Sequence, residues 1–285
     1  MFVKKEDRKL TLELIIEYEN YLLEQERSSA TILKYIHSLK EAMIFFKGNV
    51  LTKQETILWK KHLSEQYSVS SVNGALAALN GYFNFCGWED LKVKPLKRQR
   101  DLFCSEDKEL TQEEYIRLVR TAQKQGNLRL SLVIQTICST GIRVSELEYI
   151  TAESVKTGRA IVFSKGKQRK VLLPKRLCIL LAEYLKQQKR TKGAIFITKN
   201  GRPLNRSNIW REMKALCDSA NVAPEKVFPH NLRHLFARIY YTLEKDLSRL
   251  ADLLGHTSID TTRIYTAESG AVHARQMERM GLVVT

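Results

Sequence analysis

The stretch LRLSLVIQTICSTGIRVSEL, residues 128–147, joins a strongly apolar segment to a short segment that carries charge. Residues 128–139 are apolar enough to predict a helix buried in a core. Arg143 then opens a further helical segment, and Glu146 follows three residues later. At that spacing two side chains meet, so Glu146 can orient the Arg143 guanidinium for bidentate binding of a phosphate. A surface salt bridge is the alternative, and for an isolated pair of this kind it is the commoner case.

The chain around this stretch is predicted to be mostly helical, with one β insert. A new helix is expected near residue 110, where Thr111 followed by Glu114 fits a capping box. Residues 160–174, AIVFSKGKQRKVLLP, predict two short strands around a basic turn. Residues 194–198, AIFIT, predict another short strand that ends in a Gly turn. The remaining predicted helices cover residues 176–188, 207–219, 231–242, 246–254 and 258–264.

The first hundred residues show apolar side chains at helical spacing. This spacing predicts helices over residues 11–26, 30–46 and 53–66, and a fourth from about residue 70. Together they make a compact α domain over residues 1–91. Residues 92–108 are charged, contain Pro95 and lack periodicity, which predicts a basic linker to a second domain over 109–285. The expected fold is therefore mainly α with a small β-hairpin insert, in two domains.

The composition is that of a basic globular protein. The 285 residues include 47 Lys and Arg against 31 Asp and Glu, a formal net charge of +16. The surplus is spread over both predicted domains, which favours a polyanion partner such as nucleic acid. A general solubility surplus is the alternative. No stretch approaches 18 apolar residues without a charge, and the N-terminus lacks the apolar core of a signal peptide, so we expect an intracellular protein without membrane contact.

The sequence lacks the motifs of metal-dependent and nucleotide-dependent chemistry. Its five Cys residues are scattered without a CxxC pair, and it contains no HExxH motif and no GxxxxGK[ST] loop. We therefore expect no metal site. Phosphoryl transfer can still run by covalent catalysis, which needs a nucleophile, cations around the phosphate oxygens and an acid for the leaving group.

Three further segments concentrate cations and hydrogen-bond donors. The segment HNLRH places His230 and Arg233 three residues apart, where a helical surface pair is the alternative to an anion site. The basic turn carries Lys165, which can reach into a groove unless it is only a solvated hairpin tip. The segment LLGH ends in His256, and Tyr265 follows nine residues later. Taken alone, a Tyr is more often core packing and a His more often structural.

The order and spacing of these segments resemble the signature of the tyrosine recombinases, also called the phage integrase family. That family shows an Arg in a G-x-R-x-x-E-L segment, a Lys in a β-hairpin, then H-x-x-R, L-G-H and a Tyr nine residues on. Here the corresponding segments are TGIRVSEL, SKGKQRKVLLP, HNLRH, LLGH and IDTTRIY. The motifs cover about residues 110–270, and the two-domain layout resembles the DNA clamp of the family over the whole chain.

The resemblance implies a site-specific DNA recombinase with six catalytic residues, namely Arg143, Lys165, His230, Arg233, His256 and Tyr265. Tyr265 would attack the scissile phosphate and form a 3′-phosphotyrosyl bond, while Lys165, or Lys167 as its rival, would protonate the leaving 5′-oxygen. The two arginines and His256 would bind the phosphate, His230 would act as base or phosphate ligand, and Glu146 would support Arg143. Because the phosphotyrosyl link keeps the energy of the broken bond, no metal, ATP or other cofactor is implied.

The resemblance also implies double-stranded DNA as the substrate and a homo-tetramer on two DNA sites. Contacts to DNA are expected mainly at phosphates, from Lys34, Lys40, Lys97, Arg98, Lys167 and Arg169. Residues 270–285 would dock on a neighbouring protomer, with packing on their own domain as an equal alternative. The expected location is the cytoplasm, in association with the nucleoid, with a second recombinase or an accessory protein as an optional partner.

Two other functions fit parts of the pattern. A non-catalytic DNA-binding protein would keep the clamp but would not need Tyr265. A DNA-relaxing enzyme of the type IB topoisomerase class shares the Tyr, Arg and Lys chemistry, yet it needs no partner protomer. The motifs do not encode the DNA target, nor the choice among integration, excision, inversion and dimer resolution.

Overall fold

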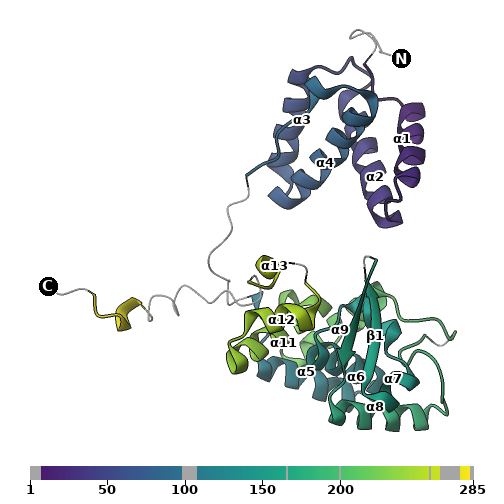
Figure 1. The fold of residues 1–285 in the computed structure, drawn as a ribbon, viewed down its shortest axis with the longest axis vertical. Helices are drawn as coiled ribbons and strands as arrows, with labels where there is room; N and C mark the ends of the chain where they lie inside the picture. Colours follow the sequence, from purple (N-terminus) through teal and green to yellow (C-terminus); the bar gives the residue numbers. More distant parts are fainter. Residues whose placement is uncertain are drawn as a thin grey trace. The chain divides into compact units, whose positions relative to one another are not determined.

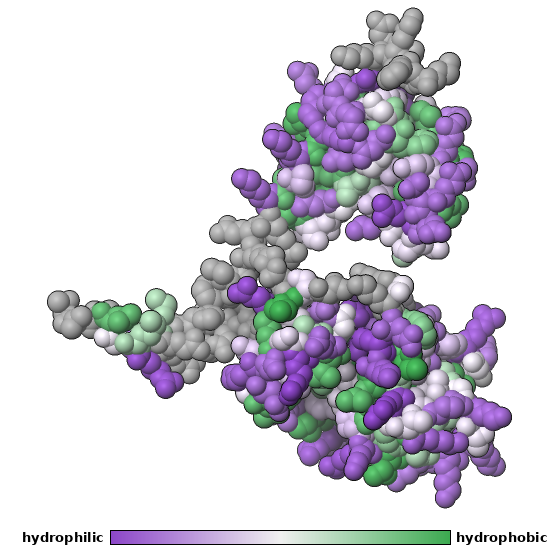
Figure 2. All heavy atoms as spheres, in the orientation of Figure 1, coloured by the Kyte–Doolittle hydropathy of each residue, from purple (hydrophilic) through white to green (hydrophobic). Residues whose placement is uncertain are grey.

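The fold is mostly helical, as the sequence predicts. The computed structural model describes residues 8–97, 108–164, 166–198, 200–256, 258–263 and 277–282. The chain divides into two compact units, Met1–Arg100 and Asp101–Thr285. Within the described ranges the β structure is one two-stranded antiparallel sheet (Figure 1), and no described helix is long and apolar enough to cross a membrane. On the face shown in Figure 2, most of the surface of both units is hydrophilic, with apolar side chains scattered between.

The described part of the first unit contains four α-helices. These are α1 (Leu12–Glu24), α2 (Ser29–Phe46), α3 (Lys53–Gln66) and α4 (Val69–Cys86), followed by the short 3₁₀ helix η2 (Glu89–Leu91). Each α-helix begins after a Thr or Ser whose hydroxyl accepts a backbone N–H three residues on, namely Thr11, Ser28, Thr52 and Ser68. The four predicted helices are thus confirmed, with ends that differ from the prediction by up to two residues.

The apolar faces of these helices meet in a core rich in aromatic rings. Tyr18, Phe46, Trp59, Tyr82 and Phe83 are each 2% exposed or less. Large rings of this kind bury more apolar area than any other side chain, so they account for much of the stability of such a small unit. This core packs the helices against one another, and their opposite faces carry exposed side chains.

Residues 92–97, which the sequence places in the linker, are bound to the first unit. Asn80 on α4 donates to the Val93 carbonyl at 2.8 Å and accepts the Val93 N–H at 3.0 Å. Asn73, two turns earlier on the same face of α4, makes the same pair of bonds with Leu96 at 3.0 and 2.7 Å. The two amides serve this segment as a neighbouring strand would, so it is an ordered edge of the first unit.

The second unit surrounds its sheet with helices. It begins with α5 (Gln112–Lys124), α6 (Leu128–Thr140), the 3₁₀ helix η4 (Val144–Tyr149) and α7 (Ala152–Thr157), and the strands β1 (Arg159–Ser164) and β2 (Lys167–Leu172) follow. After them come α8 (Lys175–Gln187), α9 (Arg206–Lys214), α10 (Cys217–Ala220), η5 (Pro224–Lys226), α11 (Pro229–Glu244), α12 (Leu247–Leu254) and α13 (Ile259–Arg263). The predicted capping box of Thr111 and Glu114 is present at the start of α5.

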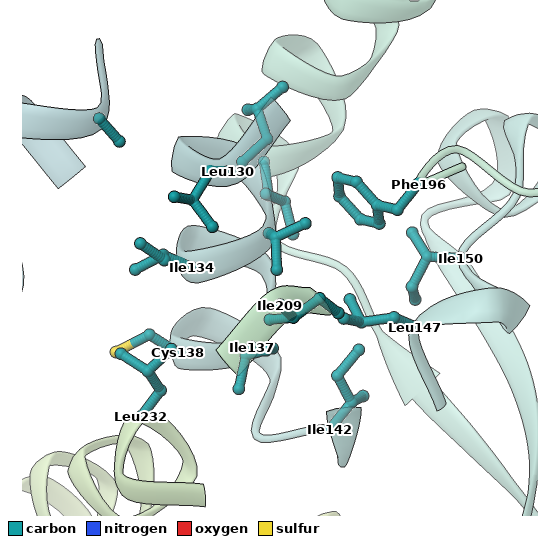
Figure 3. Close-up of a cluster of buried hydrophobic side chains, with 14 of the residues drawn as sticks. Leu130, Ile134, Ile137, Cys138, Ile142, Leu147, Ile150, Phe196, Ile209 and Leu232 are labelled. Atoms are coloured by element: carbon teal, nitrogen blue, oxygen red, sulfur yellow. The ribbon is translucent and has the colours of Figure 1, made fainter. Parts of the chain in front are cut away.

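Helix α6 is the buried helix that the apolar run predicts. Its Leu130, Ile134 and Ile137 are 2% exposed or less. Figure 3 shows these side chains among others from distant segments, including Phe196, and Leu232 from α11. Helices α5, α8 and α11 pack against α6. Because α6 is surrounded in this way, the turn that ends it at Gly141 is held rigidly in the middle of the unit.

The β1–β2 hairpin places one face on the core and the other in solvent. Arg159 pairs with Leu172 at one end of the ladder and Ser164 with Lys167 at the other. Val162 and Val171 are buried, whereas Phe163 and Leu172 are more than half exposed. Side chains alternate between faces along a strand, so Arg169, which pairs with Val162 and lies two residues before Val171, points toward the core.

Three sequence predictions need correction. The predicted strand at 194–198 forms only isolated bridges, one of them between Ile197 and Pro203, which has no N–H to continue a ladder. The predicted helix at 207–219 is split into α9 and α10, because Leu216 donates to Met213 rather than continuing the α-helical pattern. The helical segment expected to open at Arg143 is the 3₁₀ helix η4, with Arg143 at its N-cap.

Candidate active site

The structure describes four of the six predicted catalytic residues. Arg143, His230, Arg233 and His256 are described, whereas Lys165 and Tyr265 lie outside the described residues. Arg98 and most of the predicted docking segment 270–285 also lie outside, and of Lys167 only the backbone pairing with Ser164 is described. Lys34 and Lys40 on α2, together with Lys97, are exposed on the first unit.

Arg233 is the most deeply buried of the four catalytic candidates that the structure describes. It lies one turn after His230 near the start of α11 and is 1% exposed. Its guanidinium donates to the carbonyl of Gly141 at 2.5 Å and to the carbonyl of Leu254 at 2.9 Å. These carbonyls end α6 and α12, where helix dipoles concentrate negative charge, so two helix C-termini hold one arginine.

His256 continues the same chain of hydrogen bonds. Its Nε2 lies 2.8 Å from Arg233 Nη2, and its Nδ1 lies 2.8 Å from the hydroxyl of Thr262 on α13. A guanidinium only donates, so Nε2 must accept and the ring proton sits on Nδ1, which donates to Thr262. Burial, followed by the charges of Arg233, Arg143 and Arg169, lowers the pKa of His256 to about 4. The ring is therefore neutral at neutral pH.

Glycine is required at both turns that surround Arg233. Gly141 and Gly255 have positive φ angles of 63° and 66°, which other residues rarely adopt. A Cβ on Gly141 would lie 2.5 Å from Phe236 Cδ1, and one on Gly255 would lie 2.3 Å from Arg169 Cδ. These contacts explain physically why the TGIR and LLGH segments each carry a glycine at this position.

Arg143 is held by a carboxylate rather than by carbonyls. Glu146 is fully buried, and its Oε1 accepts from Arg143 Nη1 at 3.0 Å. Its Oε2 accepts the backbone N–H of Arg143 at 2.9 Å and also Arg169 Nη2 at 2.7 Å. The side chain of Arg143 remains 33% exposed. The predicted orientation of Arg143 by Glu146 is present, and the structure adds Arg169 as a second guanidinium on the same carboxylate.

His230 lies beside this cluster of cations. Burial lowers its pKa most, and the charges of Arg233, Arg143 and Arg206 lower it further. Its ring meets that of His234 edge to face, with the centroids 4.7 Å apart. Both His230 and His256 feel the charges of Arg143 and Arg233, so residues from α11, the start of η4 and the turn after α12 gather at one place. Such a site favours an anion and a neutral imidazole.

Sequence reasoning missed the roles of Arg169 and Thr262. Arg169 was expected to contact DNA, yet its guanidinium turns inward to Glu146 and to the carbonyl of Leu253, at 2.8 Å. Alternation along β2 could have revealed this, because Arg169 shares the inward face with Val171. Thr262 is fully buried and carries no sequence signal that distinguishes it from its neighbour Thr261. No group of three His, Cys, Asp or Glu side chains suited to a metal occurs among the described residues.

Comparison with known proteins finds matches to both parts of the chain. The profile of the phage integrase family matches residues 108–271, and that of the phage integrase N-terminal SAM-like domain matches residues 15–90. Tyrosine recombinase XerA of Pyrococcus furiosus is 28% identical over 97% of this chain and 97% of its own. A lambda integrase dimer bound to a COC′ core site superposes with a TM-score of 0.76 at 17% identity, covering 91% of this chain and 96% of that one. A lambda integrase tetramer bound to a Holliday junction gives 0.74 at 18% identity, covering 93% and 80%.

The two solved structures, at these identities, show the fold alone, and they confirm the predicted two-domain architecture. The family profile carries more, since it covers over half of the chain and includes all five segments on which the resemblance rests. The chain therefore belongs to the phage integrase family, the tyrosine recombinases.

Proposed function

We propose that the protein is a site-specific recombinase that cuts and rejoins double-stranded DNA through a 3′-phosphotyrosyl intermediate. The observation that carries the proposal is the hydrogen-bonded chain from Arg233 through His256 to Thr262. Thr262 lies three residues before Tyr265. Three residues span at most about 11 Å, so Tyr265 would be within reach of the cluster of cations.

The proposed chemistry follows from the charge of the cluster. Arg143 and Arg233 place two permanent positive charges where the transition state of the phosphoryl transfer concentrates negative charge. Both ring nitrogens of His256 are engaged by Arg233 and Thr262, so His256 would orient Arg233 at the phosphate and would bind the phosphate itself only by exchanging its bond to Arg233. Because burial and the neighbouring arginines lower the pKa of His230, this imidazole is neutral at neutral pH and can accept the proton of Tyr265. The nucleophile is thereby activated without a cofactor.

The leaving group needs a proton donor on the hairpin. In the sequence Lys165 follows directly after the last residue of β1, and Lys167 is the first residue of β2. We assign the general acid to Lys165 and keep Lys167 as the rival. Substitution of each by Met tests the choice on DNA with a bridging 5′-sulfur, because a thiolate leaves without a proton. The lysine whose loss is rescued by the sulfur is the acid.

Assembly and DNA contacts form the second part of the proposal. Lys34 and Lys40 lie exposed on α2, and Lys97 lies exposed at the end of the segment bound to α4; this exposure supports contacts of all three with phosphates. In the described part of the C-terminal segment, Met277, Met280 and Leu282 are 70%, 61% and 74% exposed. This apolar exposure supports docking of residues 270–285 on a second protomer in a tetramer on two DNA sites. We place the protein on the nucleoid in the cytoplasm, with or without an accessory partner.

The decisive experiment follows the covalent bond. Duplexes bound by Tyr265→Phe are selected from random DNA, and the resulting site is rebuilt as a nicked suicide substrate with a 5′ label upstream of the cut. In EDTA, wild type should shift this label to a protein adduct on a denaturing gel and release a fragment whose 5′-hydroxyl a kinase can phosphorylate. Tyr265→Phe should bind with equal affinity and form no adduct.

Each other outcome would point to a different nucleophile or to a different class of DNA-binding protein. An adduct with Tyr265→Phe would assign the nucleophile to another residue. Tight binding of the selected site without any adduct would make the protein a non-catalytic DNA-binding protein. An adduct together with relaxation of supercoiled plasmid, but without strand exchange between two labelled sites, would indicate a relaxing enzyme of the topoisomerase class.

A further inference from the structure

Arg169 is a buried cation that the proposed mechanism does not use. Its side chain is 15% exposed, far less than that of Arg143. One terminal nitrogen donates to the carbonyl of Leu253, and the other donates to Glu146. A buried arginine is costly to desolvate, and the two directed bonds of Arg169 offset this cost while they tie its partners together.

The contacts of Arg169 connect three elements that are far apart in the sequence. The residue itself lies on β2, Glu146 lies in η4, and Leu253 is the penultimate residue of α12. The aliphatic part of the side chain also packs against Gly255, where a Cβ would approach Cδ to 2.3 Å. Arg169 therefore lies directly between the carboxylate that orients Arg143 and the turn that presents His256.

The charge balance gives Arg169 a second effect. Glu146 accepts two hydrogen bonds from Arg143 and one from Arg169, so one buried negative charge is shared by two positive charges. With Arg143 alone, the negative charge of Glu146 would cancel the positive charge of the guanidinium that is proposed to bind the phosphate. With Arg169 also bound, the trio keeps a net positive charge while the Arg143 guanidinium stays oriented.

We propose that Arg169 is a positioning residue that, through Glu146 and the end of α12, holds Arg143 and the His256 turn in the geometry that binds the scissile phosphate. The inference rests on the proposed recombinase function and deepens it, since it names a further residue on which the same site depends. In this proposal Arg169 acts through Glu146 and the carbonyl of Leu253. Its loss should slow cleavage and leave DNA binding intact.

The test compares Arg169→Met with Lys170→Met in single-turnover cleavage of the suicide substrate at saturating protein. Lys170 is the next residue on β2, carries the same charge and lies exposed opposite Ile161, so it controls for charge and strand position. Arg169→Met should form the adduct about ten- to a hundredfold more slowly, as expected for a lost hydrogen bond to a charged group. Its affinity for the DNA should stay within about twofold of wild type, as should both properties of Lys170→Met.

Two further measurements separate positioning from a general loss of structure. In a double-mutant cycle, Glu146→Gln and Arg169→Met should be strongly non-additive, because both act on Arg143 through one carboxylate. A methylphosphonate at the scissile position removes the negative charge that Arg143 meets. On the diastereomer that wild type cleaves, the Arg169→Met defect should shrink. Arg169→Lys, which can keep one of the two bonds, should recover part of the rate.

The outcomes distinguish this inference from the function on which it rests. If wild type forms no adduct, the proposed function fails. If wild type forms the adduct and Arg169→Met does so at the same rate, only the inference fails. An Arg169→Met defect that is equal on phosphate and methylphosphonate, and additive with Glu146→Gln, would also overturn it, since it would then reflect loosened folding.

Discussion

Arg143 and Arg233, the two arginines proposed to bind the phosphate, are held in opposite ways. Arg233 is 1% exposed and is fixed by the backbone carbonyls of two helix ends. Arg143 has a side chain that is 33% exposed and is oriented by the carboxylate of Glu146, which it shares with Arg169. The partners of Arg233 include backbone carbonyls at two helix ends, whereas the carboxylate that orients Arg143 is a side chain that a substitution can remove.

Because of this difference, substitutions at the two arginines should affect stability and activity to different degrees. Backbone carbonyls cannot be removed by substitution, so Arg233 satisfies polar groups that the fold buries in any case. Arg143 satisfies a buried carboxylate that has a second partner in Arg169. The α11–α12 region should therefore lose stability and activity together, whereas the η4–β2 region should lose activity with little change in stability.

The largest effect is expected from Arg233→Met. The substitution leaves the carbonyls of Gly141 and Leu254 buried without this donor and removes a partner of His256. The free energy of unfolding should fall by about 3 kcal/mol, and cleavage of the suicide substrate should slow by about a thousandfold or more. Urea denaturation and single-turnover cleavage measure the two quantities. An unchanged unfolding free energy would show that Arg233 is not part of the structural frame.

Arg143→Met should produce the opposite balance. Glu146 keeps Arg169 and the backbone N–H of residue 143, so the free energy of unfolding should fall by only about 1 kcal/mol. Cleavage should still slow by about a hundred- to a thousandfold, because a charge at the transition state is lost. The ratio of the two effects, compared with that of Arg233→Met, is the sharpest measure of the contrast. Equal stability losses in the two variants would contradict it.

The pH dependence of stability should also originate in the α11–α12 region. The folded state lowers the pKa of His256 and of His234 to about 4, in both cases chiefly through burial. Between about pH 6.5 and 4 the unfolded chain therefore binds protons that the folded chain does not, so the free energy of unfolding falls as the pH falls. Above about pH 6.5 this contribution is constant and fully present.

The variant His256→Gln should reduce this dependence, because Gln can accept from Arg233 without titrating, and His234 should account for the part that remains. Urea unfolding at pH 4.5 and 7.5 provides the comparison, with His37→Gln as the control. The side chain of His37 is 74% exposed on α2, so this variant should keep the dependence of wild type. A wild-type slope that persists in His256→Gln would move the titration to His234 or elsewhere.

The sequence predicted most of the fold because the decisive signals are local. Apolar spacing and hydroxyl caps define the helices, and the glycines at 141 and 255 mark turns that admit no side chain. The predicted pairing of Arg143 with Glu146 also depends on a three-residue spacing. Each of these features depends on residues close together in the sequence, so a single sequence is enough to predict it.

The parts that the sequence did not predict depend on distant contacts. Arg169 meets Glu146 across 23 residues and Leu253 across 84, and no periodicity encodes such partners. Asn73 and Asn80 bind residues 92–97, which resemble a linker in the sequence because they show no apolar periodicity. Their backbone is bound by amide side chains instead of a neighbouring strand, and no sequence pattern predicts such bonds. Side-chain bonds to a distant backbone are the features that pattern reasoning misses.

The smallest effect is expected at Thr262, which stands three residues before the proposed nucleophile Tyr265 in the sequence. Thr262→Val keeps the shape of the buried side chain but removes the oxygen that accepts from His256 Nδ1. We expect a loss of about 1 kcal/mol in the free energy of unfolding and a three- to tenfold slower cleavage, because a net hydrogen bond of this size is lost. Thr261→Val, one residue earlier and exposed, is the matched control and should match wild type. The contrary result would be a Thr262→Val variant that cleaves as slowly as Arg143→Met but keeps full stability. The hydroxyl would then behave like the η4–β2 region, where activity is lost alone, and α13 would not share the behaviour of the α11–α12 region.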